Sequence, residues 1–335
     1  MADKSLILTC MKNEGAWLLE WVAFHLSIGF DHILVYSNDC VDGTDQMLDR
    51  LAEMGLATRY NNDRKPHHRP SYQLRAYRKA RKNPMLEDYA YTAIIDADEF
   101  INVKLGDGSV GALIAETGRP DVISLPWRVF GTGGIAEYRP GFVTEAFTWA
   151  ARENRPRPAQ LWGMKSLFRT EAIAQFGLHR PVQPEGGDWS ALRWVNPAGT
   201  EMPERYHAQT SGNWRFDRET IDYSAAQINH YAVKFRKSYI TKVLRGSAHG
   251  GIARDETYFQ IMNQNEEPDH AIARLLPAAK ARYADLLTDP VLAQWDAHAR
   301  AWHEDKITTA LRSPEGKELL DRLSERDKLP ENQKT

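Results

Sequence analysis

Short apolar runs alternate with amphipathic stretches through the first hundred residues. The runs at 6–10, 32–36 and 56–60 are typical of strands, and the stretches between them place apolar side chains at helical spacing. An unbroken apolar run indicates a strand that is covered on both faces, as in a parallel sheet. The resulting β-α-β-α-β order predicts an α/β fold that begins as a Rossmann-like, doubly wound sheet.

Residues that favour helix ends predict boundaries within this pattern. Asn13 is expected to cap the first helix, and Gly29 is expected to close it. Two more buried strands are predicted at 91–95 and 121–125, and we expect Pro126 to stop the second of them.

The pattern changes after this sheet. Residues 127–215 are rich in Gly, Pro and Trp, which predicts loops and short strands that form the wall of a cleft. From about residue 218 the pattern becomes helical, and 270–335 is charged and mostly helical by composition. Residues 328–335 are expected to form a frayed tail.

Composition indicates a globular protein without the charge of a nucleic-acid binder. The 335 residues are 42% hydrophobic and 26% charged, with a net charge of -2. A duplex-binding protein carries a basic excess that displaces counterions, so no nucleic-acid partner is expected. Ten Trp, 13 Tyr and 11 Phe fit either a large aromatic core or rings that line a cleft.

The sequence contains no apolar run of the roughly 18 residues that a membrane span needs, and no signal peptide is recognised at its start. Two cysteines, Cys10 and Cys40, are too few for a disulfide framework. These features predict a cytoplasmic protein without a transmembrane segment. They are compatible with peripheral contact at the inner face of a membrane and with a homo-oligomer.

The strongest chemical signal is the acidic segment 96–100, which directly follows a predicted buried strand. Ligands of open α/β sheets bind beyond the carboxyl ends of the strands. Asp96 and Asp98 are two residues apart, so they can share one hard divalent cation, Mn²⁺ or Mg²⁺. Such an ion would neutralise a substrate diphosphate. The alternative is an acidic strand end that only caps the next helix.

Two further groups of residues are weaker signals. The turns at 9–14 and 37–44 follow the first two strands and are expected to open into the same crevice. His230 precedes a basic stretch with Lys234, Lys242 and Arg245, so it can complete a cation site while the basic side chains face phosphate oxygens. For both groups, ordinary polar surface remains an alternative.

In their order along the chain, several segments resemble a family-2-like glycosyltransferase, in the branch that also includes family-92-type enzymes. The segments are 12–14, 20–25, 29–32, 38–44, 95–100, 127–134, 165–169, 179–181 and 229–231, followed by Lys234, Lys242, Arg245 and Gly246. The resemblance covers residues 5–250. It implies a GT-A fold with a nucleotide-sugar-binding half at 1–125 and an acceptor-side half at 126–250. Residues 251–335 are then a helical extension.

The resemblance also implies roles for individual residues. Thr9, Asn13, Glu14 and Asn38 correspond to positions that hold the nucleoside. Asp96 corresponds to the aspartate that faces the ribose and the metal.

Further roles concern the metal and the diphosphate. Asp98 and His230 correspond to residues at the metal, and Lys165, Lys242 and Arg245 are candidates for diphosphate contacts. Asn38 stands where Asp is usual and Cys40 where Ser is commoner, which leaves the nucleotide open, with a UDP-sugar favoured over a GDP-sugar.

The implied reaction is transfer of a sugar from the nucleotide to a hydroxyl of a glycan or glycolipid, with inversion at the anomeric carbon. Inversion needs a base on the opposite face of the sugar. Segment 184–189 offers Asp188 and, as the rival, Glu185, with glycines between them and Trp189 beside them for stacking on the acceptor.

Two other functions remain open from the sequence. A nucleotidyltransferase acting on sugar phosphates would share the nucleotide-binding sheet and the paired aspartates. Such enzymes carry a Gly-rich loop after the first strand, whereas this chain has only Gly15 there. A non-catalytic sugar-binding module would account for the aromatic content alone.

Overall fold

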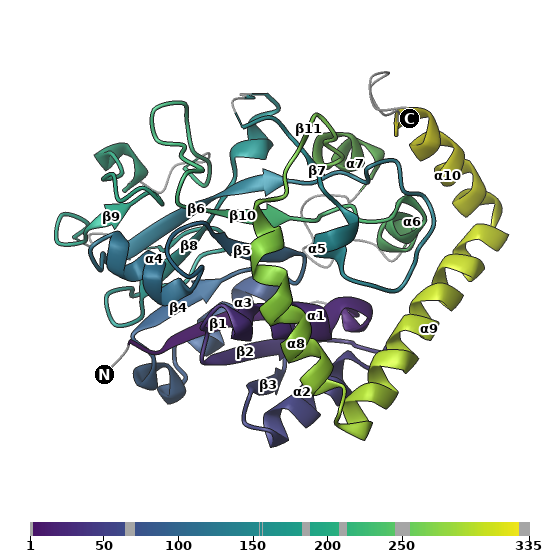
Figure 1. Ribbon diagram of the computed structural model, residues 1–335, viewed down its shortest axis with the longest axis horizontal. Coiled ribbons are helices and arrows are strands. Elements are labelled where there is room, and N and C mark those ends of the chain that lie inside the picture. Colours follow the sequence, from purple (N-terminus) through teal and green to yellow (C-terminus); the bar gives the residue numbers. More distant parts are fainter. Residues whose placement is uncertain are drawn as a thin grey trace.

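A mixed β-sheet forms the centre of the molecule (Figure 1). The computed structural model describes residues 3–63, 71–153, 155, 157–182, 188–207, 213–244 and 255–327. The strands follow the order β3-β2-β1-β4-β8-β6-β10-β5, with β9 attached to β6. Their bounds are β1 (Ser5–Met11), β2 (His32–Ser37), β3 (Ala57–Asn61), β4 (Tyr91–Ile94), β5 (Glu99–Val103), β6 (Val122–Val129), β8 (Met164–Arg169), β9 (Trp194–Val195) and β10 (Ala226–His230). β7 (Trp149–Ala150) and β11 (Glu267–Pro268) pair separately.

Helices cover both faces of this sheet and extend beyond it at the C-terminal end (Figure 1). The α-helices are α1 (Gly15–Ser27), α2 (Thr44–Glu53), α3 (Tyr72–Ala80), α4 (Val110–Glu116), α5 (Val143–Ala146), α6 (Arg236–Leu244), α7 (Glu256–Met262), α8 (Leu276–Leu286), α9 (Pro290–Arg312) and α10 (Pro314–Arg326). Short 3-10 helices lie at Pro84–Asp88, Ala159–Trp162, Glu204–Tyr206 and Ala271–Leu275. None of the helices in the described part of the chain is both long and apolar enough to cross a membrane.

The alternation of side chains along the first strands explains their continuous apolar runs. Leu6 and Leu8 of β1 belong to the core beneath α3, whereas Ile7 between them belongs to the core beneath α1. β1 pairs in parallel with β2 and with β4, and β2 pairs in parallel with β3. The predicted strands at 6–10, 32–36, 56–60 and 91–95 are therefore confirmed, as is the predicted α/β class with a mixed sheet and C-terminal helices.

The predicted capping role of Asn13 is wrong. Asn13 adopts a left-handed conformation with φ of 53°, and its side-chain oxygen accepts a hydrogen bond from the backbone N–H of Val41 at 2.8 Å. The backbone N–H groups at the start of α1 donate instead to side chains that follow β2, with Gly15 N–H donating to Asp42 at 2.8 Å and Glu14 N–H donating to Thr44, the first residue of α2, at 3.0 Å. Asn13 thus joins two loops at the sheet edge.

Pro126 does not stop its strand, contrary to the prediction. β6 continues to Val129, and Trp127 N–H donates to Gly163 on the β8 side of the strand. On its other edge β6 pairs with β9 at Val122 and Ile123 and with β10 only from Trp127 onward. The missing N–H of Pro126 therefore falls in a gap between two partners, where proline is tolerated.

The prediction of a helical pattern from residue 218 missed a central strand. β10 lies between β6 and β5, and its sequence Ala-Gln-Ile-Asn-His offers few apolar residues. β8 was not predicted either, because its buried residues include Lys165 and Ser166. It lies in the middle of the sheet and not in a cleft wall as predicted. The helices predicted for 270–335 are confirmed as α8, α9 and α10, while 328–335 lie outside the described residues.

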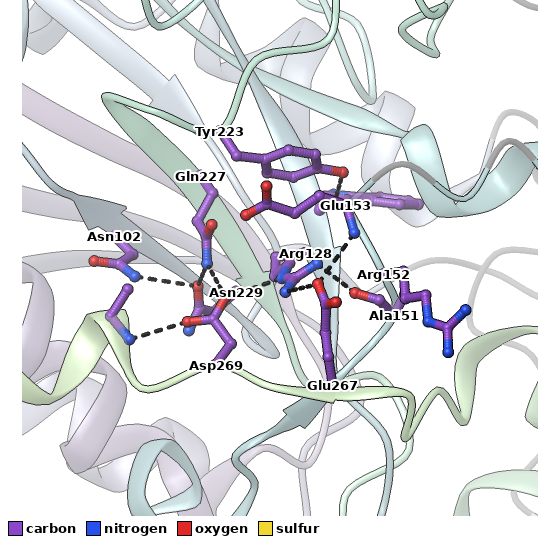
Figure 2. A network of polar contacts seen from close by, with 12 residues as sticks. Asn102, Arg128, Ala151, Arg152, Glu153, Tyr223, Gln227, Asn229, Glu267 and Asp269 are labelled. Atoms are coloured by element: carbon purple, nitrogen blue, oxygen red, sulfur yellow. Dashed lines mark hydrogen bonds and ion pairs between the residues drawn. The ribbon is translucent and has the colours of Figure 1, made fainter.

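Buried polar side chains of β10 bind the chain segment that precedes α8 (Figure 2). Gln227 donates to Asp269 at 3.0 Å and to Asn229 at 2.7 Å. The buried guanidinium of Arg128 in β6 donates to Asp269 at 2.9 Å and to Glu267 at 2.7 Å. This network explains why β10 shows no hydrophobic signal, since one of its faces is satisfied by hydrogen bonds and not by apolar contacts.

The C-terminal helices complete the cover of the first helix. All residues of α1 from Gly15 to His25 are buried, although the outer face of a surface helix is normally polar. α8 lies across α1, and α9 runs along one side of the molecule past α2 and α6 to α10 (Figure 1). A side chain at Gly15 would meet Ala299 of α9 at 2.8 Å, so the close approach of these two helices requires glycine.

Candidate active site

The sheet topology brings two distant acidic and basic segments to one edge. Asp96 follows the end of β4, and Asp98 directly precedes β5, which begins at Glu99. β10 ends at His230, and its antiparallel register pairs His230 with Glu99. The pairing places the imidazole beside the acidic segment, although the two are far apart in sequence.

Asp98, His230 and Lys242 form one cluster at this edge. The Asp98 carboxylate lies 3.7 Å from Nε2 of His230 and accepts a hydrogen bond from the Lys242 ammonium at 2.8 Å. Lys242 projects from α6 and also donates to the backbone oxygen of Ala232 at 2.9 Å. Tyr231 N–H donates to the backbone oxygen of Asp98 at 2.8 Å and fixes the turn between the two aspartates and β5.

His230 is neutral at physiological pH. Burial lowers the pKa of its imidazole to about 4, although Asp98 acts in the opposite direction. The ring packs against Trp127 with 4.5 Å between the centroids, and its Nδ1 is buried without a hydrogen-bond partner in the described residues. A neutral imidazole beside a carboxylate offers a nitrogen lone pair and anionic oxygens to a cation.

Asp96 lies in a second cluster that is built around a buried lysine. Its two carboxylate oxygens accept hydrogen bonds from Gln73 at 2.8 Å and from the Lys165 ammonium at 3.0 Å. Burial alone would lower the pKa of Lys165, but the carboxylates of Asp96 and Glu99 outweigh that effect and raise it. Lys165 therefore stays cationic and holds Asp96 in place.

Two members of this cluster were not identified from the sequence. Glu99 is fully buried, accepts a hydrogen bond from Asp96 N–H at 2.8 Å and lies 3.4 Å from Lys165. Burial raises the pKa of Glu99 to about 8, while the Lys165 ammonium acts in the opposite direction. Glu99 belongs to the acidic segment that the sequence singled out, whereas nothing in the sequence distinguishes Gln73.

The candidate nucleoside residues lie on the neighbouring strand ends. Asn38 follows β2, accepts a hydrogen bond from the Cys10 thiol at 3.7 Å and donates to Asp39 at 3.1 Å. Thr9 is fully buried within β1, and its hydroxyl has no hydrogen-bond partner among the described residues. Asn13 and Glu14 open toward a different space, described next.

A cavity of about 420 Å³ lies between α1, α6 and α9. Asn13, Glu14 and Lys242 contribute to its lining, so it adjoins the Asp98 cluster through Lys242. The opposite wall comes from α9, with Trp302 and Lys306.

The candidate base Asp188 is not joined to these clusters by any of the hydrogen bonds found in the described structure. Its exposed carboxylate accepts hydrogen bonds from the Ser190 hydroxyl at 2.6 Å and from Ser190 N–H at 2.8 Å, and these bonds lower its pKa. Trp189 stacks on His207 with 5.6 Å between centroids, and stacks on Trp194 as well. The rival base Glu185 and the predicted phosphate contact Arg245 lie outside the described residues.

The protein supplies few metal ligands of its own in this arrangement. Within the described ranges, no group of three or more His, Cys, Asp or Glu side chains is placed to hold a metal ion. Asp98 and His230 are a pair. A pair suffices where a hard cation takes its remaining ligands from substrate phosphates and water.

Comparison with known proteins identifies one family. A sequence model of glycosyltransferase family 92 matches residues 7–242. None of the curated proteins is significantly similar in sequence. The match ends within α6, so the helices after it lie beyond the matched region.

Solved structures align with this chain at low sequence identity and low TM-score. S. aureus TarS 1-349 in complex with UDP-GlcNAc is 13% identical, with a TM-score of 0.37 over 97% of this chain and 89% of that chain. Glucosyl-3-phosphoglycerate synthase from Mycobacterium tuberculosis, in complex with Mn²⁺, UDP and glucosyl-3-phosphoglycerate, is 14% identical, with a TM-score of 0.27 over 51% of this chain and 58% of that chain.

Proposed function

The chain belongs to glycosyltransferase family 92, and on that premise we propose that it is a metal-dependent, inverting enzyme that takes its sugar from a nucleoside diphosphate donor. The observation that carries the proposal is the meeting of Asp98, His230 and Lys242 at the carboxyl edge of the sheet. Family membership favours this activity over the two other functions that the sequence left open, a nucleotidyltransferase and a sugar-binding module.

Asp98 and His230 are the proposed metal-holding residues, and their chemistry fits Mn²⁺ or Mg²⁺. The fit rests on the Asp98 carboxylate, which lies 3.7 Å from Nε2 of a neutral imidazole, so that one ion can reach both groups. A bound divalent ion would neutralise charge on the departing diphosphate. Asp96 is the less direct candidate, because its oxygens accept hydrogen bonds from Gln73 and Lys165, and its proposed role is to face the ribose.

Lys242 is the proposed source of a second positive charge for the diphosphate. Its ammonium lies 2.8 Å from the Asp98 carboxylate, so an anionic group that reaches Asp98 through a cation also approaches Lys242. Lys165 is buried and engaged with Asp96, so we propose that it orients this carboxylate and does not itself contact phosphate. Arg245 keeps its predicted phosphate role.

The nucleoside is proposed to lie over the ends of β1 and β2. Asn38 and Asn13 are the polar side chains there, and Glu14 begins the turn into α1. Thr9 is proposed to support this surface from below, since its side chain is buried. We propose a UDP-sugar as the donor, with a GDP-sugar as the alternative.

A glycan or glycolipid hydroxyl is the proposed acceptor. Asp188, with Glu185 as the rival, is the proposed base that removes the proton of this hydroxyl as it attacks. Asp188 is exposed, so an acceptor can reach it from solvent. A cytoplasmic location, with contact at the inner face of a membrane, agrees with a glycolipid acceptor.

Donor binding tests the proposal directly. We expect the full chain to bind UDP in a calorimetric titration only when Mn²⁺ or Mg²⁺ is present, and to release UDP slowly from a UDP-sugar. Asp98→Asn removes the anionic ligand while keeping the side-chain shape, so the metal-dependent part of the affinity should fall at least tenfold. His230→Gln should weaken it in the same direction.

The matched control is Asp321→Asn, which makes the same change at an exposed position of α10. It should bind UDP as the unmodified chain does. Unchanged metal-dependent UDP affinity in Asp98→Asn would contradict the proposed metal site. A preference for GDP over UDP would correct the nucleotide and leave the site in place.

A further inference from the structure

The cavity between α1, α6 and α9 contains a buried cation that has no anionic partner within the described part of the chain. Lys234 is only 5% exposed and lines the cavity. Its ammonium lies 4.3 Å from the centre of the Trp17 ring, and no carboxylate of the described residues comes within ion-pair distance of it. A buried charge normally has a counter-ion, because removing it from water costs several kcal/mol.

The carboxylate that interacts electrostatically with Lys234, that of Glu20, is hydrogen-bonded to other residues. Lys234 lowers the pKa of Glu20, which burial raises to about 7. The Glu20 carboxylate, however, accepts hydrogen bonds from Val143 N–H at 2.8 Å and from Thr144 N–H at 3.1 Å at the start of α5. It therefore leaves the cavity side of Lys234 without an anion.

The backbone of this lysine is also unusual. Lys234 has φ of 51°, in the left-handed region that is unfavourable for a residue with a long side chain. Asn13, across the cavity, has φ of 53°. Asparagine tolerates this conformation, so the strain lies at Lys234, and such strain is concentrated at functional sites.

The remaining lining combines positive charge with apolar and aromatic surface. Lys306 extends from α9 with its ammonium 5.2 Å from the centre of the Trp302 ring, and Glu14 is the acidic residue of the lining. Lys242 also lines the cavity, but its ammonium is paired with Asp98, so the positive charge offered to a ligand comes from Lys234 and Lys306. Val41 is 67% exposed and Leu244 is 49% exposed. Exposed apolar side chains of this size beside a cavity are typical of ligand sites.

We propose that this cavity binds the acceptor and selects one that carries an anionic group, a phosphate or a carboxylate, next to a sugar ring. The anion would lie between Lys234 and Lys306, and the ring would pack against Trp302. The inference rests on the proposed glycosyl transfer and adds the class of acceptor to it.

The origin of the cavity wall favours the acceptor over the donor. Trp302, Lys306 and their neighbours on α9 lie beyond residue 242, where the family match ends. A donor site is needed by every member of the family, so it is expected within the matched region. A wall that lies outside this region instead suits the ligand that distinguishes this chain.

Three sugars that share the glucose ring and differ in the group at C6 test the proposal. Glucose 6-phosphate, glucuronate and glucose are titrated into the full chain by calorimetry at low salt with Mn²⁺ present, once without UDP and once with UDP at saturation. At least one anion should bind at least tenfold more tightly than glucose, and the anion that binds identifies phosphate or carboxylate as the recognised group.

Substitutions assign this binding to the cavity. Lys306→Ala should weaken the anion at least threefold and Lys234→Gln at least tenfold, because each removes a positive charge from the cavity. Lys306→Arg should retain binding. Lys317→Ala, which removes an exposed lysine of α10, is the matched control and should change the affinity less than twofold.

Several results would overturn the inference. Equal binding of glucose and both anions would exclude selection of an anionic acceptor. Absence of binding by either anion at roughly 10 mM, near the weak end of measurable affinity, would exclude it as well. Displacement of the anion by UDP assigns the cavity to the donor. UDP binding, recorded in the same samples, reports on the proposed function separately, so a chain that binds UDP but neither anion contradicts only this inference.

Discussion

At the scale of single residues, burial sets the protonation states that the site needs. His230 is kept neutral by burial, while Lys165 is kept charged by Asp96 and Glu99 despite burial. Sequence motifs identified His230, Lys165 and Asp96 as candidate site residues. The raised pKa of Glu99 depends on its enclosure within the sheet, which no local pattern encodes.

His25 provides a test of this effect away from the site. It is buried between α1 and β5, where Nδ1 lies 2.8 Å from the Trp21 carbonyl and Nε2 accepts from Ile101 N–H at 3.3 Å. Burial lowers the pKa of His25 from 6.5 to about 3. Between pH 6.5 and about pH 3, the imidazole is protonated in the unfolded chain but not in the folded chain. His25 should therefore lower the free energy of unfolding by about 1.4 kcal/mol for each unit by which the pH decreases in this range.

His25→Gln should flatten this dependence in urea unfolding between pH 4.5 and 7.5, because glutamine can keep a donor and an acceptor but does not titrate. His298→Gln, at an exposed position of α9, is the control and should keep the slope of the unmodified chain. Equal slopes in all three proteins would show that His25 does not control the acid stability.

The proposed base is tested by turnover. Asp188→Asn preserves an oxygen that can accept from Ser190 but cannot take up the acceptor proton, so turnover should fall roughly 10²-fold with donor affinity nearly unchanged. Glu185→Gln is measured in parallel, with the anomeric configuration of the product by NMR. Retained configuration would exclude inversion, and full activity in both variants would place the base on another segment.

At the scale of elements, the apolar pattern predicted strands well where apolar contacts cover both faces. β1, β2 and β4 are such strands. β8 and β10 were missed because their inward side chains are polar and are satisfied by partners distant in sequence, as Gln227 is by Asp269. The fold class was therefore predictable, while the strands that carry Lys165 and His230 to the site became visible only in three dimensions.

Loop conformations also depend on residues that are distant in sequence. Asn13 was correctly placed at a sheet edge, but its left-handed backbone and its bond to Val41 depend on the neighbouring loop. The acidic segment was predictable from its position after a strand, whereas its pairing with His230 follows from the register of β10 on β5. Sequence order alone does not specify such a register.

At the scale of the whole molecule, residues after the family match are part of the core. Asp327, at the end of α10, has a fully buried side chain that accepts hydrogen bonds from Thr132 at 2.7 Å and from Arg236 at 2.6 Å. Asn263 donates to the same carboxylate at 2.8 Å. A buried carboxylate held by three donors fixes the last helix against the loop after β6 and against α6.

Deletion of 270–335 tests how far the rest of the chain depends on these helices. The deletion removes α8 and α9 from the outer face of α1, which is apolar and fully buried along Gly15–His25, and it leaves Arg236 without Asp327. We expect the remnant to aggregate on expression, because an apolar face of this size is exposed. Size-exclusion chromatography of the expressed protein is the measurement.

Two milder changes make the result interpretable. Deletion of 328–335 keeps α8, α9 and α10 and should leave the protein monodisperse with its melting temperature nearly unchanged. Asp327→Asn keeps the shape of the side chain but removes its charge, which should cost about 3 kcal/mol of stability because Arg236 loses its buried partner. A remnant without 270–335 that is monodisperse and still releases UDP from a UDP-sugar would contradict the packing role. It would show that these helices serve the acceptor alone, since their loss would then remove only the α9 wall of the cavity.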